Sequence, residues 1–508
     1  MRLRKVLVLE RHARKIDCVK YTNRSTMNIL YAVVLVLIVL TLLVVSLARL
    51  HTVRTKADYL VAGRSLPAFV LIFTLLSSWI GSGSLLGGAE NAYRHGFAAL
   101  WQAGGGWLGL VVIYFVAPRA RKFAQFTIPD LLETRYSQTA RILGVIAILF
   151  AYTAITSYQL IGGGDILHLI FPTVITPTLG KYVIAAFVIV FTAIAGMSSV
   201  AYMDVVIGMM ATITMLVAAP ILLHHAGGWA GLHAALPPTH FQVLGDLTLI
   251  QGLELLVPTG LLMLGNQSMY QKFFSAKSET AARRAVVGWV IGTVILETVI
   301  VLIAVVGSAL FPSGEVHAHP REIIAYTATA PLPKGLPTLL GALLLGAVFA
   351  KIISTANNYL FSPATNLVND VYARYINRDA SNKKILIVSR LVVVLLGMWA
   401  LYQAVHTESV LKKTLYAYTI YAAALTPVIL AAFYSRRATA AGAVSAIAAG
   451  TVVTVFWDTA AVKTHLPAMI AARDAIFPAL LAALVCLVVV SALTKPPRPE
   501  QLLPFASD

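Results

Sequence analysis

The stretch LLLGAVFAKIISTANNYLFSPATNLVNDVY, residues 343–372, decides how the chain folds. Its first half is an apolar run typical of a helix that crosses a membrane, yet Lys351 lies inside that run. A charge at the centre of a bilayer costs roughly 2.5–3.5 kcal/mol on insertion scales, so such residues usually mark a functional cavity. Lys351, Ser354 and Thr355 are three and four residues apart and therefore share one helix face.

The whole chain has the composition of a helical membrane protein. Of its 508 residues, 58% are hydrophobic and 12% are charged, about half the charged share of a soluble domain. Apolar runs of roughly 20 residues recur along its whole length. We therefore expect an all-α polytopic membrane protein with about 13 transmembrane helices. The expected spans are 27–50, 67–92, 98–118, 139–170, 179–197, 200–223, 249–266, 286–311, 336–362, 385–405, 414–435, 438–458 and 474–493.

The net charge of +18 reports membrane topology and not a nucleic-acid partner. Basic residues cluster in alternate short loops, whereas the loop 224–247 contains neither Lys nor Arg. The basic loops should be cytoplasmic, which predicts a multi-pass protein of the cytoplasmic (inner) membrane. The residues that support this orientation are Arg49, Arg54, Lys56, Arg64, Arg119, Arg121, Lys122, Arg135, Lys272, Lys277, Arg283, Arg284, Arg374, Arg378, Lys383, Lys384, Arg436 and Arg437.

Residues 1–26 differ from everything that follows them, because they are polar and basic. Thirteen spans with cytoplasmic basic loops would place this tail outside, where positive charge is disfavoured. Two interpretations stay open: a basic N-terminal tail, or translation that begins at Met27. The two cysteines, Cys18 and Cys486, suggest neither a disulfide framework nor a metal site, and common protease and esterase signatures are absent, so an enzyme is not expected.

The second span, PAFVLIFTLLSSWIGSGSLLGGAENAYRHG (67–96), contains a cluster of glycines and serines. Each glycine weakens a helix by roughly 1 kcal/mol, and an unwound backbone is tolerated in a membrane where it lines a cavity. Transporters use such breaks to hold ions and substrates. The alternative is close helix packing, for which Gly83 and Gly87 form a G-x-x-x-G pair.

Neutral oxygens and acids accompany the lysine. Asn357 and Asn358 follow Thr355, and hydroxyl and amide oxygens are ligands for hard cations, although lone Ser and Thr side chains often bond their own helix. Five acids lie in apolar runs, where acids usually face a cavity or a partner. They are Glu90, Asp165, Asp204, Glu254 and Glu297, of which Glu297 has no polar sequence neighbour that suggests a role.

Four stretches resemble the sodium:solute symporter family over nearly the whole chain after Met27. ADYLVAGRSLP (57–67) is similar to the segment before the family's first core helix, and AKIISTANNYLFSPATNLVNDVY (350–372) is similar to its eighth. TIPDLLETRY (127–136) and NQSMYQKFFSAKSETAARRA (266–285) are similar to its cytoplasmic loops.

The resemblance implies a LeuT-type fold of two inverted five-helix repeats with flanking helices. The implied domains are an N-terminal tail (1–26), an extra helix and loop (27–66), a ten-helix core (67–435), two C-terminal helices (436–493) and a cytoplasmic tail (494–508). The repeats would span about 67–223 and 249–435.

The resemblance also implies ion ligands. A first sodium site would use carbonyls matching Ser77, Ile80 and Lys351 and hydroxyls matching Ser354 and Thr355. A second site, present in some members, would use residues matching Asp204, Asn357 and Asn358. The chain departs from the family at Lys351, where a small residue is usual, at the Asn357–Asn358 pair, and at Ile207, where a polar residue is frequent.

Three interpretations of Lys351 follow. Its ammonium could replace the sodium ion, could pair with an acid such as Asp204, or could turn away and leave its carbonyl to the ion. The coupling ion is therefore sodium or a proton, with no covalent cofactor expected.

The expected function is secondary active transport of a small organic solute (a sugar, amino acid, carboxylate or vitamin) by alternating access in a lipid bilayer. The alternatives are a sodium-independent transporter of the same fold and a membrane sensor that binds solute without transporting it. Candidate substrate-binding residues are Ser82, Gly83, Glu90, Asn91, Glu254 and Asn266.

Overall fold

The computed structural model describes residues 29–45, 61–123, 127–194, 197–407 and 409–505, together with Ala48 and Asp58. The tail 1–26, the alternative start at Met27, and Cys18 lie outside these residues.

Helices form nearly all of the described chain. Eleven helical segments among the described residues are long and apolar enough to cross a membrane, which makes this a multi-pass membrane protein. Two shorter apolar helices, Ile29–Val45 and Ala68–Trp79, accompany them. The expected count of thirteen is not confirmed, in part because the second expected span is divided by a break.

The α-helices are α3 (Ala68–Trp79), α4 (Ala89–His95), α5 (Leu100–Phe123), α6 (Ile128–Arg135), α7 (Gln138–Ile170), α8 (Pro177–Ile194), α9 (Met197–His225), α10 (Gly228–Ala235), α11 (Leu249–Gly265), α12 (Gln267–Ser275), α13 (Glu279–Leu310), α14 (Glu315–Ala318), α15 (Ile323–Thr329), α16 (Thr338–Asn366), α17 (Asn382–Val405), α18 (Val410–Ile420), α19 (Thr426–Tyr434), α20 (Ala440–Trp457), α21 (Ala460–Lys463), α22 (Ala468–Ala471), α23 (Ile476–Leu493) and α24 (Pro499–Leu502). Short 3₁₀ segments are η1 (Ala62–Arg64), η3 (Gly96–Ala99), η4 (Pro238–Phe241), η5 (Pro320–Glu322) and η8 (Leu503–Phe505). Wider π turns are η2 (Gly83–Gly88), η6 (Leu367–Ile376) and η7 (Tyr421–Leu425).

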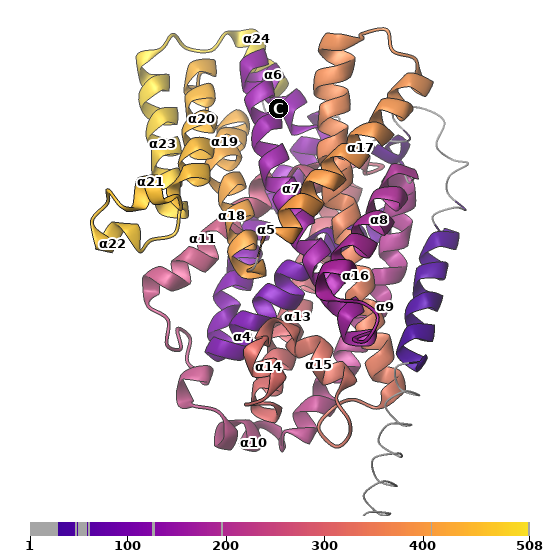
Figure 1. The fold of residues 1–508 in the computed structure, drawn as a ribbon. Coiled ribbons are helices and arrows are strands. Elements are labelled where there is room, and N and C mark those ends of the chain that lie inside the picture. Colours follow the sequence, from indigo (N-terminus) through magenta and orange to yellow (C-terminus); the bar gives the residue numbers. More distant parts are fainter. Residues whose placement is uncertain are drawn as a thin grey trace, which may run out of the picture.

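The long helices run between two ends of the molecule (Figure 1). Helices α6 and α24 lie at one end, and α10, α14 and α15 lie at the other. The second of these ends includes the loop 224–247, which lacks Lys and Arg. By the positive-inside rule, we expect the end with α6 and α24 to be the cytoplasmic one. The C-terminal helices α20 and α23 pack on each other at one flank.

Helix α16 is the central helix of the bundle. It packs against α7, α8 and α9, and every residue from 344 to 366 is buried. The lysine in this helix is therefore surrounded by protein and not by lipid.

The first helix of the expected core is broken, as the glycine–serine cluster predicts. α3 ends at Trp79, and Ile80 adopts an extended conformation (φ −82°, ψ 99°) before the turn η2 begins at Gly83. A Cβ atom at Gly81 would lie 2.7 Å from the Thr355 hydroxyl oxygen, so glycine is required by the close approach of α16.

A second break separates α11 from α12. Asn266 is extended (φ −73°, ψ 111°), and its side chain caps α12 by accepting the Met269 N–H. Our expectation for residues 266–285 was wrong in this part. The first residues form a buried helix, and the side chain of Lys272 is fully buried instead of lying in a cytoplasmic loop.

Candidate functional site

The break after α3 meets the middle of α16 through one hydroxyl. Thr355 Oγ1 lies 2.8 Å from the Ser77 carbonyl oxygen, 3.3 Å from that of Ile80 and 2.8 Å from that of Lys351. Thr355 donates within this group of acceptors, and all four residues are buried. Three carbonyls from two distant segments thus converge at one point.

Asp204 of α9 forms the acidic part of the site. Its carboxylate accepts hydrogen bonds from the hydroxyls of Ser354 and Thr74, the latter at 2.5 Å, and from Asn358 Nδ2 at 3.3 Å. The Asp204 side chain is fully buried. Three donors satisfy a carboxylate that would otherwise be costly at this depth.

The ammonium of Lys351 lies inside this site. Lys351 Nζ donates to Ser77 Oγ at 3.1 Å, and the side chain has no exposed surface. Among the described residues, no ion pair within 4 Å joins Lys351 to an acid, and Asp204 is the acid whose charge acts on it. The side chain therefore points into the helix break and does not reach the membrane surface.

A second buried lysine, Lys272, completes the cluster, although its sequence position predicted a basic loop. Lys272 Nζ donates to Asn358 Oδ1 at 2.9 Å and to Ser268 Oγ at 3.0 Å. Asn358 thus connects Lys272 to Asp204. The signal available in the sequence was the flanking stretch MYQKFF, in which the lysine has apolar and aromatic neighbours on both sides.

Asn357 lies outside this cluster. Its Oδ1 accepts the hydroxyl of Thr192 from α8 at 2.9 Å, whereas Asn358 contacts Asp204 and Lys272. Neighbouring residues of a helix point about 100° apart, so Asn357 and Asn358 face different helices. We therefore leave Asn357 out of the proposed site.

Three substrate candidates lie at the two helix breaks. The Ser82 N–H donates to Gln159 Oε1 at 2.7 Å, and Ser82 is fully buried. Gly83 faces tyrosines, since a Cβ atom there would lie 3.0 Å from the Tyr418 hydroxyl. Asn266 accepts from the Tyr152 hydroxyl at 2.6 Å and donates to that of Tyr359 at 2.9 Å.

Buried tyrosines between the breaks were not anticipated. The rings of Tyr359 and Tyr421 lie 4.7 and 5.2 Å from the ring of Tyr152, and the ring of Tyr418 stacks on Trp79 at 5.9 Å. Aromatic rings that carry a hydroxyl combine an apolar face with a hydrogen-bonding tip. This arrangement suits a small solute that has both polar and apolar parts.

The other candidates lie apart from this cluster. Glu90 forms an ion pair with Arg94 at 3.2 Å on the partly exposed α4, and Asn91 is buried in the same helix. Glu254 accepts the backbone N–H of Asp474 at 3.2 Å, at the loop before α23. We therefore leave Glu90 and Glu254 out of the proposed substrate site.

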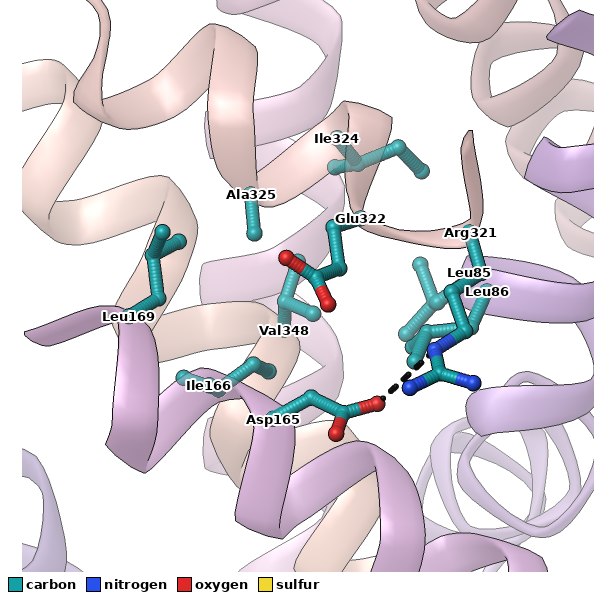
Figure 2. Close-up of a pocket in the computed structure, with 10 residues that line it drawn as sticks. All are labelled: Leu85, Leu86, Asp165, Ile166, Leu169, Arg321, Glu322, Ile324, Ala325 and Val348. Atoms are coloured by element: carbon teal, nitrogen blue, oxygen red, sulfur yellow. Dashed lines mark ion pairs between the residues drawn. The ribbon is translucent and has the colours of Figure 1, made fainter. Parts of the chain in front are cut away.

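Ion pairs connect the helices on both sides of the site. At the non-cytoplasmic end, Asp165 of α7 pairs with Arg321 of η5 at 3.1 Å, as Figure 2 shows. Beside them is a cavity of about 10 Å³ that Leu85 and Leu86 help to line. At the cytoplasmic end, Arg141 pairs with Asp130 and with Glu133, the latter at 2.7 Å. These contacts join α7 to η5 at one end and to α6 at the other, and the side chain of Asp165 is buried.

The sodium ion that the resemblance implies can be tested against these atoms. Carbonyl and hydroxyl oxygens of the required kind are present around Thr355. However, the Ser354 hydroxyl is bound to Asp204, and the Lys351 ammonium lies at Ser77 within the same set. With this ammonium charged, the set does not fit a sodium ion.

The fold and the site define a class of protein, namely a helical membrane transporter with two broken helices around a polar centre. The chain belongs to the sodium:solute symporter family, whose model matches residues 59–450. Members of this family are transporters and not enzymes, and the family's description names sodium as the ion that is carried with the solute.

Individual relatives agree with this assignment. The chain is 26% identical over 461 residues to the sodium/proline symporter of Staphylococcus aureus, covering 87% of this chain and 88% of that protein. Its fold matches a sodium-coupled sialic acid symporter in the outward-open state, with a TM-score of 0.76, 16% identity and coverage of 92% and 98%. It also matches a nucleobase–cation-symport-1 family transporter, with a TM-score of 0.58, 13% identity and coverage of 89% and 99%. These structural matches confirm the expected LeuT-type fold.

Proposed function

We propose that this protein carries a small organic solute across the cytoplasmic membrane by alternating access, with the ammonium of Lys351 in place of the family's sodium ion. The observation that carries this proposal is the position of Lys351 Nζ, 3.1 Å from Ser77 Oγ at the break of α3. In its charged form, the ammonium at this point supplies the interaction that a bound cation would otherwise make with the broken helix.

The magnitude of the repulsion supports the proposal. Two unit charges about 4 Å apart repel by roughly 4 kcal/mol at an effective dielectric constant of 20. Because every 1.4 kcal/mol is a factor of ten in affinity, this repulsion weakens sodium binding by about a thousandfold. Asp204 offsets part of the excess charge, but Lys272 adds a second cation to the same cluster.

The solute should be small and should have polar groups, because Asn266, Tyr152 and Tyr359 present amide and hydroxyl groups at the second break. The named relatives take up proline and sialic acid, so these compounds belong in the first panel of solutes to be tested. Ser82, Gly83 and Asn266 are the residues that we propose to contact the solute.

A second candidate is sodium-coupled symport of the family type. The convergence of the Ser77, Ile80 and Lys351 carbonyls on Thr355 favours it, since these oxygens could bind an ion if the ammonium turned aside. Sodium activation of uptake by the wild-type protein would select this candidate.

The experiment is uptake of labelled L-proline, sialic acid, sugars and carboxylates into proteoliposomes that contain the purified full chain. Protein-free liposomes and an Asn266→Ala variant serve as controls. Saturable uptake that requires both protein and Asn266 supports transport. Saturable binding without accumulation inside the vesicles would indicate a sensor instead.

A further inference from the structure

A buried acid outside the Lys351 cluster has no role in the function proposed so far. Glu297 lies in the middle of α13, and its side chain is almost fully buried. Glu297 Oε1 accepts a hydrogen bond from Ser84 Oγ at 2.7 Å. Ser84 belongs to η2, the first turn after the break of α3, so this acid contacts the segment that transporters of this fold keep unwound.

A small cavity adjoins this carboxyl group. Its volume is about 10 Å³, which is enough for one water molecule, and its polar lining comes from Glu297, Ser84, Trp79 and Gln102. One lining atom, the acceptor Gln102 Oε1, is buried without a hydrogen-bond partner. The indole N–H of Trp79, a donor, lies at the same cavity and interacts with the Glu297 carboxyl group.

No described cation compensates a charge on Glu297. None of the described Lys, Arg and His side chains forms an ion pair with it, and its immediate polar neighbours are neutral. An isolated carboxylate in such surroundings is costly, so a buried acid without a counter-ion is held with a proton or a bound cation.

The elements packed on α13 supply few other titratable groups. The hydroxyl of Tyr418 from α18 is close enough to interact with Glu297, whereas Glu90 and Arg94 of α4 pair with each other. Asp204 of α9 is bound by residues of α3 and α16, and His233 of α10 stacks on Phe241.

We infer that Glu297 is the proton-binding group of the transport cycle, so that solute movement is coupled to protons through α13 and η2. This inference rests on the proposed function. The O–H bond forms at a carboxylate oxygen with a proton from the water on one side of the membrane. The same bond breaks when the proton leaves to the other side.

The polar atoms of Gln102 and Trp79 explain how the proton could be sensed. The neutral acid carries a donor that suits Gln102 Oε1, whereas the carboxylate is an acceptor that suits the Trp79 N–H. Trp79 is the last residue of α3 and Ser84 follows the break, so a change in the hydrogen bonds of Glu297 acts on both sides of the break. A sodium ion fits less well, because a hard cation is bound by several oxygen ligands and this cavity offers few.

The first test needs no solute and uses protons as the only probe. The purified full chain in lipid nanodiscs is titrated between pH 5 and pH 9 and followed by infrared difference spectroscopy. We expect a band of a protonated carboxyl group that disappears as the pH rises. This band should be lost in Glu297→Gln and should shift to higher frequency in Ser84→Ala, which removes a hydrogen bond to the carboxyl oxygen.

Asp165→Asn is the matched control, because Asp165 is an equally buried acid that has Arg321 as its counter-ion. The band should persist in this variant. If Glu297→Gln retains the complete titrating carboxyl spectrum of the wild type, or if the Glu297 band does not titrate in this range, the inference is wrong.

The second test uses the solute identified in the uptake panel. An inside-alkaline pH gradient should raise wild-type uptake at least tenfold, and in Glu297→Gln the gradient should no longer change the rate. An equal stimulation of Glu297→Gln, or stimulation by a sodium gradient alone, would overturn the inference. If no solute of the panel enters the vesicles, the proposed function fails, while the spectroscopic test still decides whether Glu297 binds the proton.

Discussion

Replacing Lys351 by alanine should create a sodium requirement in this transporter, which we propose does not need sodium. The substitution removes the ammonium from Ser77 and keeps the carbonyls of Ser77 and Ile80 together with the Thr355 hydroxyl. It also leaves a small residue, which the family resemblance implies is usual at this position. The broken helix then lacks a positive charge that a sodium ion can supply.

The size of the effect follows from the charge that is removed. A repulsion of roughly 4 kcal/mol at about 4 Å corresponds to a change in ion affinity of about a thousandfold. An ion that binds Lys351→Ala at about 1 mM would therefore need about 1 M with the lysine present. Asp204 remains available to balance the charge of the bound ion. Its three hydrogen-bond donors stay in place unless one of them turns to bind the ion.

The assay is the initial rate of solute uptake against sodium concentration at fixed pH and constant ionic strength. The wild type should show no sodium activation, and Lys351→Ala should show saturable activation. Lys351→Arg keeps the charge and should behave as the wild type does towards sodium, if it folds. Thermal unfolding of each variant with and without sodium gives a second measure, since a ligand at 100 times its dissociation constant stabilises by about 2.7 kcal/mol.

Saturable sodium activation of the wild type would refute this reasoning and favour the second candidate, in which the lysine turns aside. Failure of sodium to stabilise a folded Lys351→Ala protein would also refute it, because the remaining oxygens would then not form an ion site.

Three further predictions concern the site and its surroundings. Gly81→Ala should abolish transport, because its Cβ atom would lie 2.7 Å from the Thr355 hydroxyl oxygen, whereas Gly104→Ala, with open space at its Cβ atom, should retain wild-type uptake rates. Thr355→Val should lower the free energy of unfolding by about 1–3 kcal/mol, because it removes the hydroxyl that contacts the carbonyls of Ser77 and Lys351. The measurement is denaturation in detergent. A free energy of unfolding equal to that of the wild type would contradict the placement of Thr355 in the site. In the loop before α23, burial raises the pKa of Asp474 to about 6, and Glu254 adds to the effect. The raised pKa of Asp474 stabilises the folded state below about pH 4, and this contribution is lost as the pH rises through 6. Asp474→Asn should therefore have a higher melting temperature than the wild type at pH 8. At pH 4 the two melting temperatures should be equal.

Several features could be predicted from residues alone because they depend on local chemistry. The low share of charged residues and the repeated apolar runs indicate a membrane protein whatever its tertiary structure. The glycine and serine cluster predicts a break in the second span, and the structure places that break between Trp79 and Gly83. The spacing of Lys351, Ser354 and Thr355 correctly puts their side chains on related faces of one helix.

Other features depend on which helices become neighbours. The break at Asn266 has no glycine cluster, and its extended conformation is stabilised by Tyr152 and Tyr359, which lie more than 90 residues away. Lys272 belongs to a basic segment by sequence and to the buried centre by structure. Glu297 lies in an apolar run that suggests no role for it, yet Ser84 of η2 lies within hydrogen-bonding distance.

The sequence by itself determined that the chain is a helical membrane protein, that the second span breaks, and that a lysine and two hydroxyls lie together on a buried helix. Hydrophobicity, backbone preference and helical periodicity act within a few residues, so they can be read along the chain. The tertiary structure decided that Lys351 meets Ser77, that Asn358 and not Asn357 meets Asp204, and that Glu254 faces a loop. Periodicity fixes which side chains share a face, but the packing of helices distant in sequence fixes what that face contacts.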